Sequence, residues 1–529
     1  MKHTLRNRLA AFGAAGALAL AMAPMAAMGL TADNEISVTG IADDNATVKA
    51  YLVVKEDQSN TLTDGTGGWA LNGTYGDLKL SDILGDNANG ISASEAATIA
   101  KNVTGDSTTL TKDGDKYKAT VTKPGLYIVL VEGTGATVYN PMFVGADYST
   151  DSPNTIAADA KYSGSTAVAK SSTPTITKTF TDAKDQAVQA GDKVPFEIGT
   201  TVPYYPAPYY TNPSFVITDT IDTGLTFNQQ EVVVKVGDSA LTKDTDYKVA
   251  FSGQTMTITF TKSYLQTERA ASDVKVTYEA TVSDPAAFTA NVTEMTNEAY
   301  ITFTNNPDDT TDSDHVKTHH YTFGIDADLT GATTTGTKTK ELEKVAVNAN
   351  GDIEYVTADE SFDNLSTDYS PLAGAVFQLT GKSNDGVDYS ESFTTDNMGT
   401  ISFNGLGEGT YTLKETSAPA GYQLDSTEHT VVIAAEFNND GTLKSYTITI
   451  DETVCSNVSI TNKNGEIIAT DYETKINENK TALLKNVKNG LLPSTGGTGI
   501  LFYLFVGAAI MALAVVLAKR YRKNSVTQA

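Results

Sequence analysis

Residues 275–282 read KVTYEATV, in which apolar or aromatic residues alternate with polar ones. Because successive side chains of a β-strand point to opposite faces, such a run predicts a half-buried strand. The same pattern recurs in TMTITF (255–260), NEAYITF (297–303) and SYTITI (445–450), with turn signals such as Asp440-Gly441 between runs of this kind. The chain is therefore expected to be all-β, built from tandem immunoglobulin-like sandwiches.

The amino terminus has the form of a secretory signal peptide. Three basic residues precede an apolar run from Leu9 to about Ala23, and small residues follow. Cleavage after Gly29 and cleavage after Ala32 both fit this pattern. We take residues 1–32 as the signal peptide, and the remainder is expected to be exported.

The carboxyl terminus has the form of a membrane anchor. Residues 499–518 are a nearly uncharged apolar run of about 20 residues, the length of a transmembrane helix. Four basic residues follow, and the positive-inside rule keeps such a tail in the cytoplasm: Lys519, Arg520, Arg522 and Lys523. Everything before the span is expected to lie outside the membrane.

The exported part is strongly acidic. The chain has 38 basic and 64 acidic residues, and removing residues 1–29 and 496–529 takes away seven basic residues and no acidic ones, which leaves a formal charge of −33. This charge argues against a nucleic-acid partner, which basic surfaces attract. The single cysteine, Cys455, excludes an intramolecular disulfide, so any covalent crosslink must be of another kind.

Clusters of Ser, Thr and Pro divide the exported part. Its length fits about three domains, which we place at residues 33–168, 169–322 and 323–468. The first contains a predicted helix near residues 91–103. Residues 469–491 are polar and rich in Lys and Asn, which suits a stalk before the carboxyl-terminal segment 492–529.

Motifs for catalysis or for a metal are weak. His315, His319 and His320 lie in a polar stretch without an evident third ligand, which favours a solvated linker over a metal site. EFNNDG (436–441) resembles the start of a calcium loop, but the position of the bidentate carboxylate is Thr447, which favours a hairpin turn. No hydrolytic nucleophile is evident. We expect neither an enzyme nor a cofactor nor a bound metal.

One short motif near the carboxyl terminus indicates proteolytic processing. LPSTG, formed by Leu492, Pro493, Ser494, Thr495 and Gly496, precedes the apolar span and the basic tail. In this order, the three elements resemble the cell-wall sorting signal of Gram-positive surface proteins. The resemblance implies that a sortase cleaves after Thr495, holds its carboxyl as a thioester and transfers it to an amine. Peptidoglycan and the sortases are then partners.

The interior resembles the major pilins that sortases assemble. GLGEGTYTLKETSAPAGYQL (405–424) is similar to the E-box region of their collagen-binding B-type repeat domain, and residues 175–303 resemble the isopeptide-forming D2 domain. The resemblance implies that a lysine amine attacks an asparagine carboxamide and ammonia leaves. Such chemistry needs a neutral amine and a protonated carboxyl, and burial favours both.

The resemblance assigns one crosslink to each of two domains. In the second domain it implies Lys178, Asp219 and Asn297, and the first two follow apolar residues at the alternating position. In the third domain it implies Glu415 and Asn462. Lys344 best fits the lysine there, and Lys338 and Lys340 stay open. The first domain shows no convincing set.

Polymerisation requires one more lysine. In the family this lysine is the last residue of a YPK motif. In STAVAKSSTPTITKTF (165–180), Val168, Ala169 and Lys170 stand in place of that motif. Position favours Lys170, and Lys161 is the alternative. If Lys170 accepts the thioester, the chain is the shaft subunit of a covalent pilus, with identical subunits, tip or basal pilins and host surface ligands as partners. If no lysine does, it is a monomeric wall-anchored adhesin.

Overall fold

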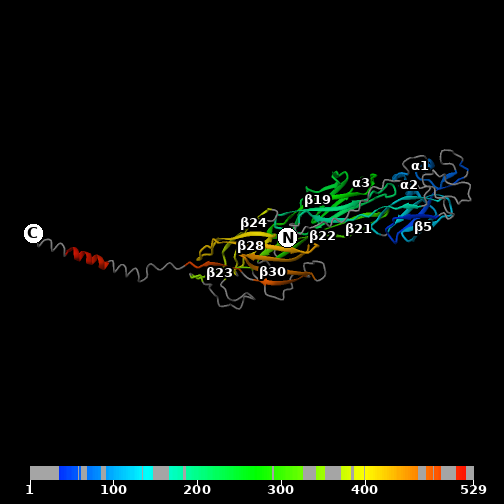
Figure 1. Cartoon of the computed structure of the whole chain (residues 1–529). Coiled ribbons are helices and arrows are strands. Elements are labelled where there is room, and N and C mark those ends of the chain that lie inside the picture. Colours follow the sequence, from blue (N-terminus) through cyan, green and yellow to red (C-terminus); the bar gives the residue numbers. More distant parts are fainter. Residues whose placement is uncertain are drawn as a thin grey trace. The chain divides into compact units, whose positions relative to one another are not determined.

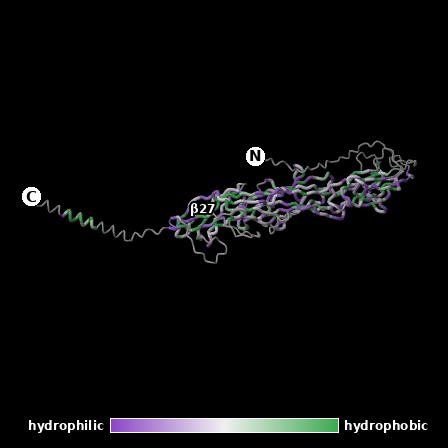
Figure 2. The backbone as a smooth tube through the Cα atoms, turned by 60° about the horizontal axis from the view of Figure 1, so that its bottom comes forward, coloured by the Kyte–Doolittle hydropathy of each residue, from purple (hydrophilic) through white to green (hydrophobic). Residues whose placement is uncertain are grey.

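The structure is a computed structural model of the whole chain, and strands form most of it (Figure 1). It describes residues 35–57, 59–60, 68–84, 91–133, 135–146, 166–182, 186–288, 291–325, 341–348, 350–351, 371–382, 386–397, 399–462, 472–479, 482–489 and 508–519. The signal peptide, LPSTG, Lys161, Lys338 and Lys340 lie outside these residues. Hydrophobic and hydrophilic segments are interspersed along the chain (Figure 2), and the many strands confirm the all-β prediction.

The chain divides into two compact units. The first comprises Met1–Gln186, Gly191–Ser283 and Glu294–His320, and the second comprises Ala187–Ala190, Asp284–Thr293 and Tyr321–Ala529. The first unit contains most of the residues of the first two predicted domains, 33–168 and 169–322.

The amino-terminal part of the first unit is a sheet in the order β8-β6-β2-β4-β5-β1-β9, with β3 beside β2. Strands β7 and β10 form a short antiparallel pair. Helix α2 (Ala93–Asn102) confirms the predicted helix, and a capping box between Ser92 and Glu95 fixes its start. The strands are β1 (Glu35–Thr39), β2 (Thr47–Glu56), β3 (Trp69–Leu71), β4 (Ser107–Asp113), β5 (Lys116–Thr120), β6 (Gly125–Glu132), β7 (Val138–Asn140), β8 (Met142–Ala146), β9 (Thr166–Val168) and β10 (Lys170–Ser172), and α1 spans Leu80–Leu84.

The rest of the first unit has two sheets. One has the order β11-β12-β19-β15-β16 with β14 on β19, and the other includes β17-β18-β13-β20-β22 with β21 on β20. Their strands are β11 (Ile176–Phe180), β12 (Lys193–Val202), β13 (Phe215–Ile221), β14 (Leu225–Phe227), β15 (Val233–Val236), β16 (Ser239–Ala240), β17 (Tyr247–Ser252), β18 (Thr255–Phe260), β19 (Ser272–Val282), β20 (Val292–Asn306), β21 (Asp309–Asp312) and β22 (Val316–Ile325), with helix α3 at Lys262–Gln266. Alternation along β19 buries Val276, Tyr278 and Ala280 on one face, as KVTYEATV predicts.

The second unit contains a sheet in the order β25-β24-β27-β28-β29-β30-β31 and a parallel pair, β23 and β32. Its core includes Phe377, Leu413 and Ile448, and the free Cys455 is buried in it. The strands are β23 (Leu342–Val347), β24 (Val376–Lys382), β25 (Asp388–Thr394), β26 (Phe403–Leu406), β27 (Gly409–Ser417), β28 (Glu428–Phe437), β29 (Leu443–Ile450), β30 (Thr453–Asn462), β31 (Tyr472–Asn479) and β32 (Ala482–Val487); the 3₁₀ turn η2 spans Pro285–Ala287.

Two predictions about irregular segments are wrong. The predicted stalk at 469–491 contains β31 and β32, because β31 adds to the edge of the sheet at β30 and β32 pairs with β23. The predicted histidine linker is largely strand, since His319 and His320 lie on β22 and His320 is fully buried. The EFNNDG segment does form the turn between β28 and β29, where Asp440 accepts hydrogen bonds from the backbone N–H and hydroxyl of Thr442.

Among the described residues, none of the helices combines the length and the apolar character that crossing a membrane requires. Residues 508–518 of the predicted carboxyl-terminal span are helical, as is Lys519 after it, and residues 499–507 lie outside the described part of the chain.

Candidate functional site

Three predicted residues of the second domain meet in its buried core. Lys178 lies on β11 of one sheet, and Asp219 on β13 and Asn297 on β20 lie in the other. Strand alternation turns each of them inward, in register with apolar residues such as Ile217 and Ala299. Lys178 and Asn297 are therefore on strands of different sheets.

The fourth member of this cluster is Tyr278 on β19. The Lys178 amine forms an ion pair with Asp219 and donates to the Tyr278 hydroxyl at 2.7 Å. That hydroxyl donates to Asp219 Oδ2 at 2.8 Å and accepts from Asn297 Nδ2 at 2.9 Å. The Lys178 and Asp219 side chains are both 0% exposed, so water does not compete for these bonds. We call these four residues the tyrosine-containing site.

The surroundings of this site favour the neutral forms of both charged groups. Burial lowers the pKa of Lys178 and raises the pKa of Asp219, and the attraction between the two charges only partly opposes these shifts. The amine also lies 5.3 Å from the centroid of the Phe196 ring and 5.3 Å from that of Tyr278. A proton moved from Lys178 to Asp219 would leave a nucleophilic amine beside a carboxylic acid.

Two buried oxygen atoms in this site lack a hydrogen-bond donor among the described residues. Asp219 Oδ1 and Asn297 Oδ1 are buried, and neither has a hydrogen-bond partner within the described ranges. A buried acceptor without a donor costs about 1–3 kcal/mol. Protonation of Asp219 would convert an acceptor into a donor, which is the change that polarising the Asn297 carbonyl requires.

A second buried set lies in the second unit. The Lys344 amine on β23 is 3.3 Å from Glu415 Oε2 on β27, and Asn486 Nδ2 on β32 donates to Glu415 Oε1 at 2.9 Å. Asn486 also donates to the backbone carbonyl of Gln423 at 2.8 Å. Burial lowers the pKa of Lys344, against the opposing charge of Glu415. We call Lys344, Glu415 and Asn486 the glutamate-bridged site.

This geometry brings to Glu415 an asparagine other than the one that the sequence suggests. The sequence-based expectation is Asn462, which ends β30 and pairs through its backbone with Tyr472 of β31. Among the side chains that the structure describes, Asn486 contacts Glu415; it is 0% exposed, and its Oδ1 has no hydrogen-bond partner among the described residues. The reason is the parallel pairing of β23 with β32, which aligns Lys344 with Leu484 and brings Asn486 to the same pair of strands.

The first domain offers no comparable set among its described residues. Between residues 35 and 146 the buried polar side chains that the structure describes are Ser37 and Thr137. Neither is an amine or a carboxamide, so the crosslinking chemistry has no reactants there.

Lys170, the expected polymerisation residue, begins β10 and pairs with Asn140 of β7. Its side chain is exposed to solvent. Partial desolvation lowers the pKa of its amine, and the negative charge of Glu268 acts in the opposite direction. An exposed lysine with a lowered pKa offers more neutral amine to an acyl donor than an ordinary surface lysine does.

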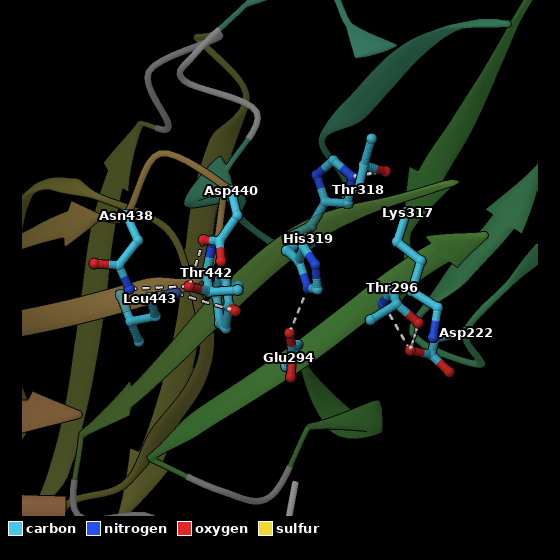
Figure 3. A network of polar contacts seen from close by, with 12 residues as sticks. Asp222, Glu294, Thr296, Lys317, Thr318, His319, Asn438, Asp440, Thr442 and Leu443 are labelled. Atoms are coloured by element: carbon cyan, nitrogen blue, oxygen red, sulfur yellow. Dashed lines mark hydrogen bonds and ion pairs between the residues drawn. The ribbon is translucent and has the colours of Figure 1, made fainter. Parts of the chain in front are cut away.

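Two of the three histidines near the second domain, His315 and His319, pair with carboxylates. His319 Nδ1 lies 2.7 Å from Glu294 Oε1, and Asp222 nearby accepts from the backbone and hydroxyl of Thr296 (Figure 3). His315 is likewise paired with Glu298. These contacts tie β20 to β22 and to the turn after β13, which supports the strand that bears Asn297.

Comparison with protein families matches three segments of the chain. Residues 190–307 match the Cna-B-like domain of Gram-positive pilin backbone subunit 2, residues 362–452 match the SpaA prealbumin-like fold domain, and residues 485–526 match the LPXTG cell wall anchor motif. In these segments the chain is similar to Gram-positive backbone pilins. Its anchor motif is that of a surface protein attached to the cell wall.

One curated relative and two solved structures illustrate what the chain is similar to. The chain is 25% identical over 449 residues to the trypsin-resistant surface T6 protein of Streptococcus pyogenes serotype M6, covering 75% of the chain and 78% of that protein. The solved structure of the T6 backbone pilin matches 86% of the chain and 98% of its own length with a TM-score of 0.50 at 18% identity. The full-length major pilin SpaD of Corynebacterium diphtheriae matches 87% and 98% with a TM-score of 0.42 at 19% identity.

Proposed function

We propose that this pilin is the repeating shaft subunit of a covalent surface pilus, stabilised by two intramolecular Lys–Asn amide bonds. The observation that supports it best is the burial of a lysine, a carboxyl and an asparagine together in two separate domains. A buried ion pair is weak as a source of stability, because desolvation offsets its attraction. Their burial is explained if these groups are the reactants of a crosslink, because the reaction requires a neutral amine and a protonated carboxyl.

The first proposed bond joins Lys178 to Asn297 and so links the two sheets of the second domain. The second joins Lys344 to Asn486 and links the first and last strands of the second unit, which are parallel neighbours. In each case the amine nitrogen bonds to Cγ of the asparagine, the Cγ–Nδ2 bond breaks, and ammonia leaves. Asp219 and Glu415 are the proposed proton-transfer groups.

The test of these bonds is the mass of the full-length chain purified in detergent. Each bond releases one ammonia, so we expect a mass about 34 Da below the encoded value, with Lys178–Asn297 and Lys344–Asn486 peptides after trypsin digestion. Asn297→Ala and Asn486→Ala should each restore about 17 Da, because each removes one electrophile.

Asn462→Ala is the matched control for this test, since it removes the asparagine of the same unit that the sequence suggests and that the proposal does not use. It should leave the full deficit in place. Loss of the second crosslink in Asn462→Ala but not in Asn486→Ala would return the assignment to Asn462. The encoded mass in the unsubstituted chain would remove both bonds from the proposal.

The proposed polymer bond joins the Thr495 carboxyl of one subunit to the Lys170 amine of the next. A pilus-specific sortase would make this bond, and a housekeeping sortase would attach the finished shaft to peptidoglycan. Tip or basal pilins and host surface ligands are the further partners that such a shaft would serve. A monomeric wall-anchored adhesin is the alternative function, and it needs no acceptor lysine.

The pH dependence of polymerisation should depend on Glu268. Its charge raises the pKa of Lys170, so Glu268→Gln should lower that pKa and increase the neutral amine at any pH below it. Assays with an isolated pilus sortase should show the acid limb of the Lys170 reaction displaced to lower pH. Glu197→Gln, which removes an exposed carboxylate paired with Lys275, is the control. An unchanged profile for Glu268→Gln would exclude this electrostatic influence.

A further inference from the structure

Tyr278 lies at the centre of the second-domain site, although it is not one of the three residues that the sequence predicts there. Its hydroxyl contacts all three: it accepts from Lys178 at 2.7 Å and from Asn297 at 2.9 Å, and it donates to Asp219 at 2.8 Å. The two nitrogens that would exchange places on Asn297 Cγ are thus held by one oxygen atom. Tyr278 is 2% exposed, and Phe196 stacks on it at 5.3 Å, so its ring is fixed.

The glutamate-bridged site shows what this tyrosine replaces. There, one carboxylate contacts both reactants directly, through Oε2 to Lys344 and through Oε1 to Asn486. In the tyrosine-containing site the carboxyl is an aspartate, which is one methylene shorter. Asp219 accepts hydrogen bonds from the Lys178 amine and the Tyr278 hydroxyl, and Asn297 Nδ2 donates to that hydroxyl. The phenol therefore completes the connection between carboxyl and carboxamide.

We propose that Tyr278 is a catalytic residue of the Lys178–Asn297 crosslink, passing a proton from the attacking amine to the departing amide nitrogen. This inference rests on the proposed function. Lys178 first gives its ammonium proton to Asp219. The protonated Asp219 is a weaker acceptor, so the hydroxyl proton of Tyr278 becomes available for another acceptor. Nζ attacks Cγ, and Tyr278 donates its proton to Nδ2 while it takes one from Nζ. The Cγ–Nδ2 bond breaks and ammonia leaves, so Tyr278 and the total charge are unchanged.

The test is the rate of crosslinking in full-length Tyr278→Phe, followed as the loss of about 17 Da over time after synthesis. Proton transfer by a positioned group contributes about 10²–10⁴ in rate, so we expect formation of the Lys178–Asn297 peptide to slow by about 100-fold or more. The Lys344–Asn486 crosslink of the same molecules should form at its usual rate, because its carboxylate contacts both reactants.

Tyr205→Phe is the matched control, since Tyr205 is also fully buried and its hydroxyl donates to the carbonyl of Thr304 at 2.9 Å. It should crosslink normally. If Tyr278→Phe does not fold, fluorotyrosine at position 278 decides the question: a proton-transfer role predicts a changed crosslinking rate and a displaced pH profile.

Crosslinking of folded Tyr278→Phe at the unsubstituted rate, or a fluorotyrosine chain with unchanged rate and pH profile, would overturn the role of Tyr278. Absence of the Lys178–Asn297 peptide from the unsubstituted chain would instead refute the proposed bond itself. The two failures are therefore distinguishable.

Discussion

Lys170→Ala is expected to abolish the ladder of covalent polymers that a pilus sortase makes from this pilin. The sortase thioester at Thr495 can be resolved only by an amine if subunits are to be joined, and Lys170 combines exposure with a pKa lowered by partial desolvation. Without that amine, the thioester should pass to water or to the cell wall. The measurement is gel electrophoresis of wall extracts under denaturing conditions, where the unsubstituted pilin gives a high-mass ladder and the variant gives the monomer.

The control for this prediction is Lys275→Ala. Lys275 is an exposed lysine of the same unit, paired with Glu197, and its replacement should leave the ladder intact. Lys161→Ala tests the alternative acceptor directly. A ladder that survives Lys170→Ala and disappears in Lys161→Ala would move the polymer bond to Lys161. Absence of a ladder from the unsubstituted pilin would favour the wall-anchored monomer.

Strand alternation explains why most of the second-domain site can be predicted from the sequence. In VITDT and NEAYITF the polar residue occupies an apolar position of a period-two pattern, so a strand that buries its neighbours must also bury Asp219 or Asn297. Tyr278 follows the same rule in KVTYEATV. The role that we propose for it is not evident from the sequence, because a buried tyrosine fits an ordinary core and only its three hydrogen-bond partners distinguish it.

The asparagine of the other site depends on strand pairing, which a single sequence does not specify. VSITN and ALLKNV both carry an asparagine near the end of an alternating run, and the polar composition around ALLKNV is typical of a stalk. Pairing of β32 with β23 is the observation that supports the proposal of Asn486, and it joins segments that are well separated in sequence. The linker prediction for His319 and His320 is wrong because strand pairing is again not specified by the local sequence. Their neighbours are polar, yet both histidines lie on β22, a largely buried strand.

The second large effect is expected in the stability of the second domain. A crosslink that closes a loop of roughly 100 residues contributes about 5 kcal/mol by restricting the unfolded chain. Asn297→Ala removes the crosslink and leaves Lys178 with Asp219, so the loss should correspond to a fall of about 10–20 °C in the melting temperature of that domain. Differential scanning calorimetry of the full-length chain checks this, with Asn486→Ala lowering the transition of the second unit instead.

The control must separate the bond from the loss of a buried amide. Asn305→Ala removes another buried asparagine of the first unit, whose Nδ2 donates to the carbonyl of Gly135 at 3.1 Å, and it should cost only about 1–3 kcal/mol. If Asn297→Ala and Asn305→Ala lower the transition equally, the crosslink does not stabilise the domain. If only Asn297→Ala has the large effect, the shaft resists unfolding because an amide bond holds its two sheets together, whereas each strand hydrogen bond contributes only about 1 kcal/mol.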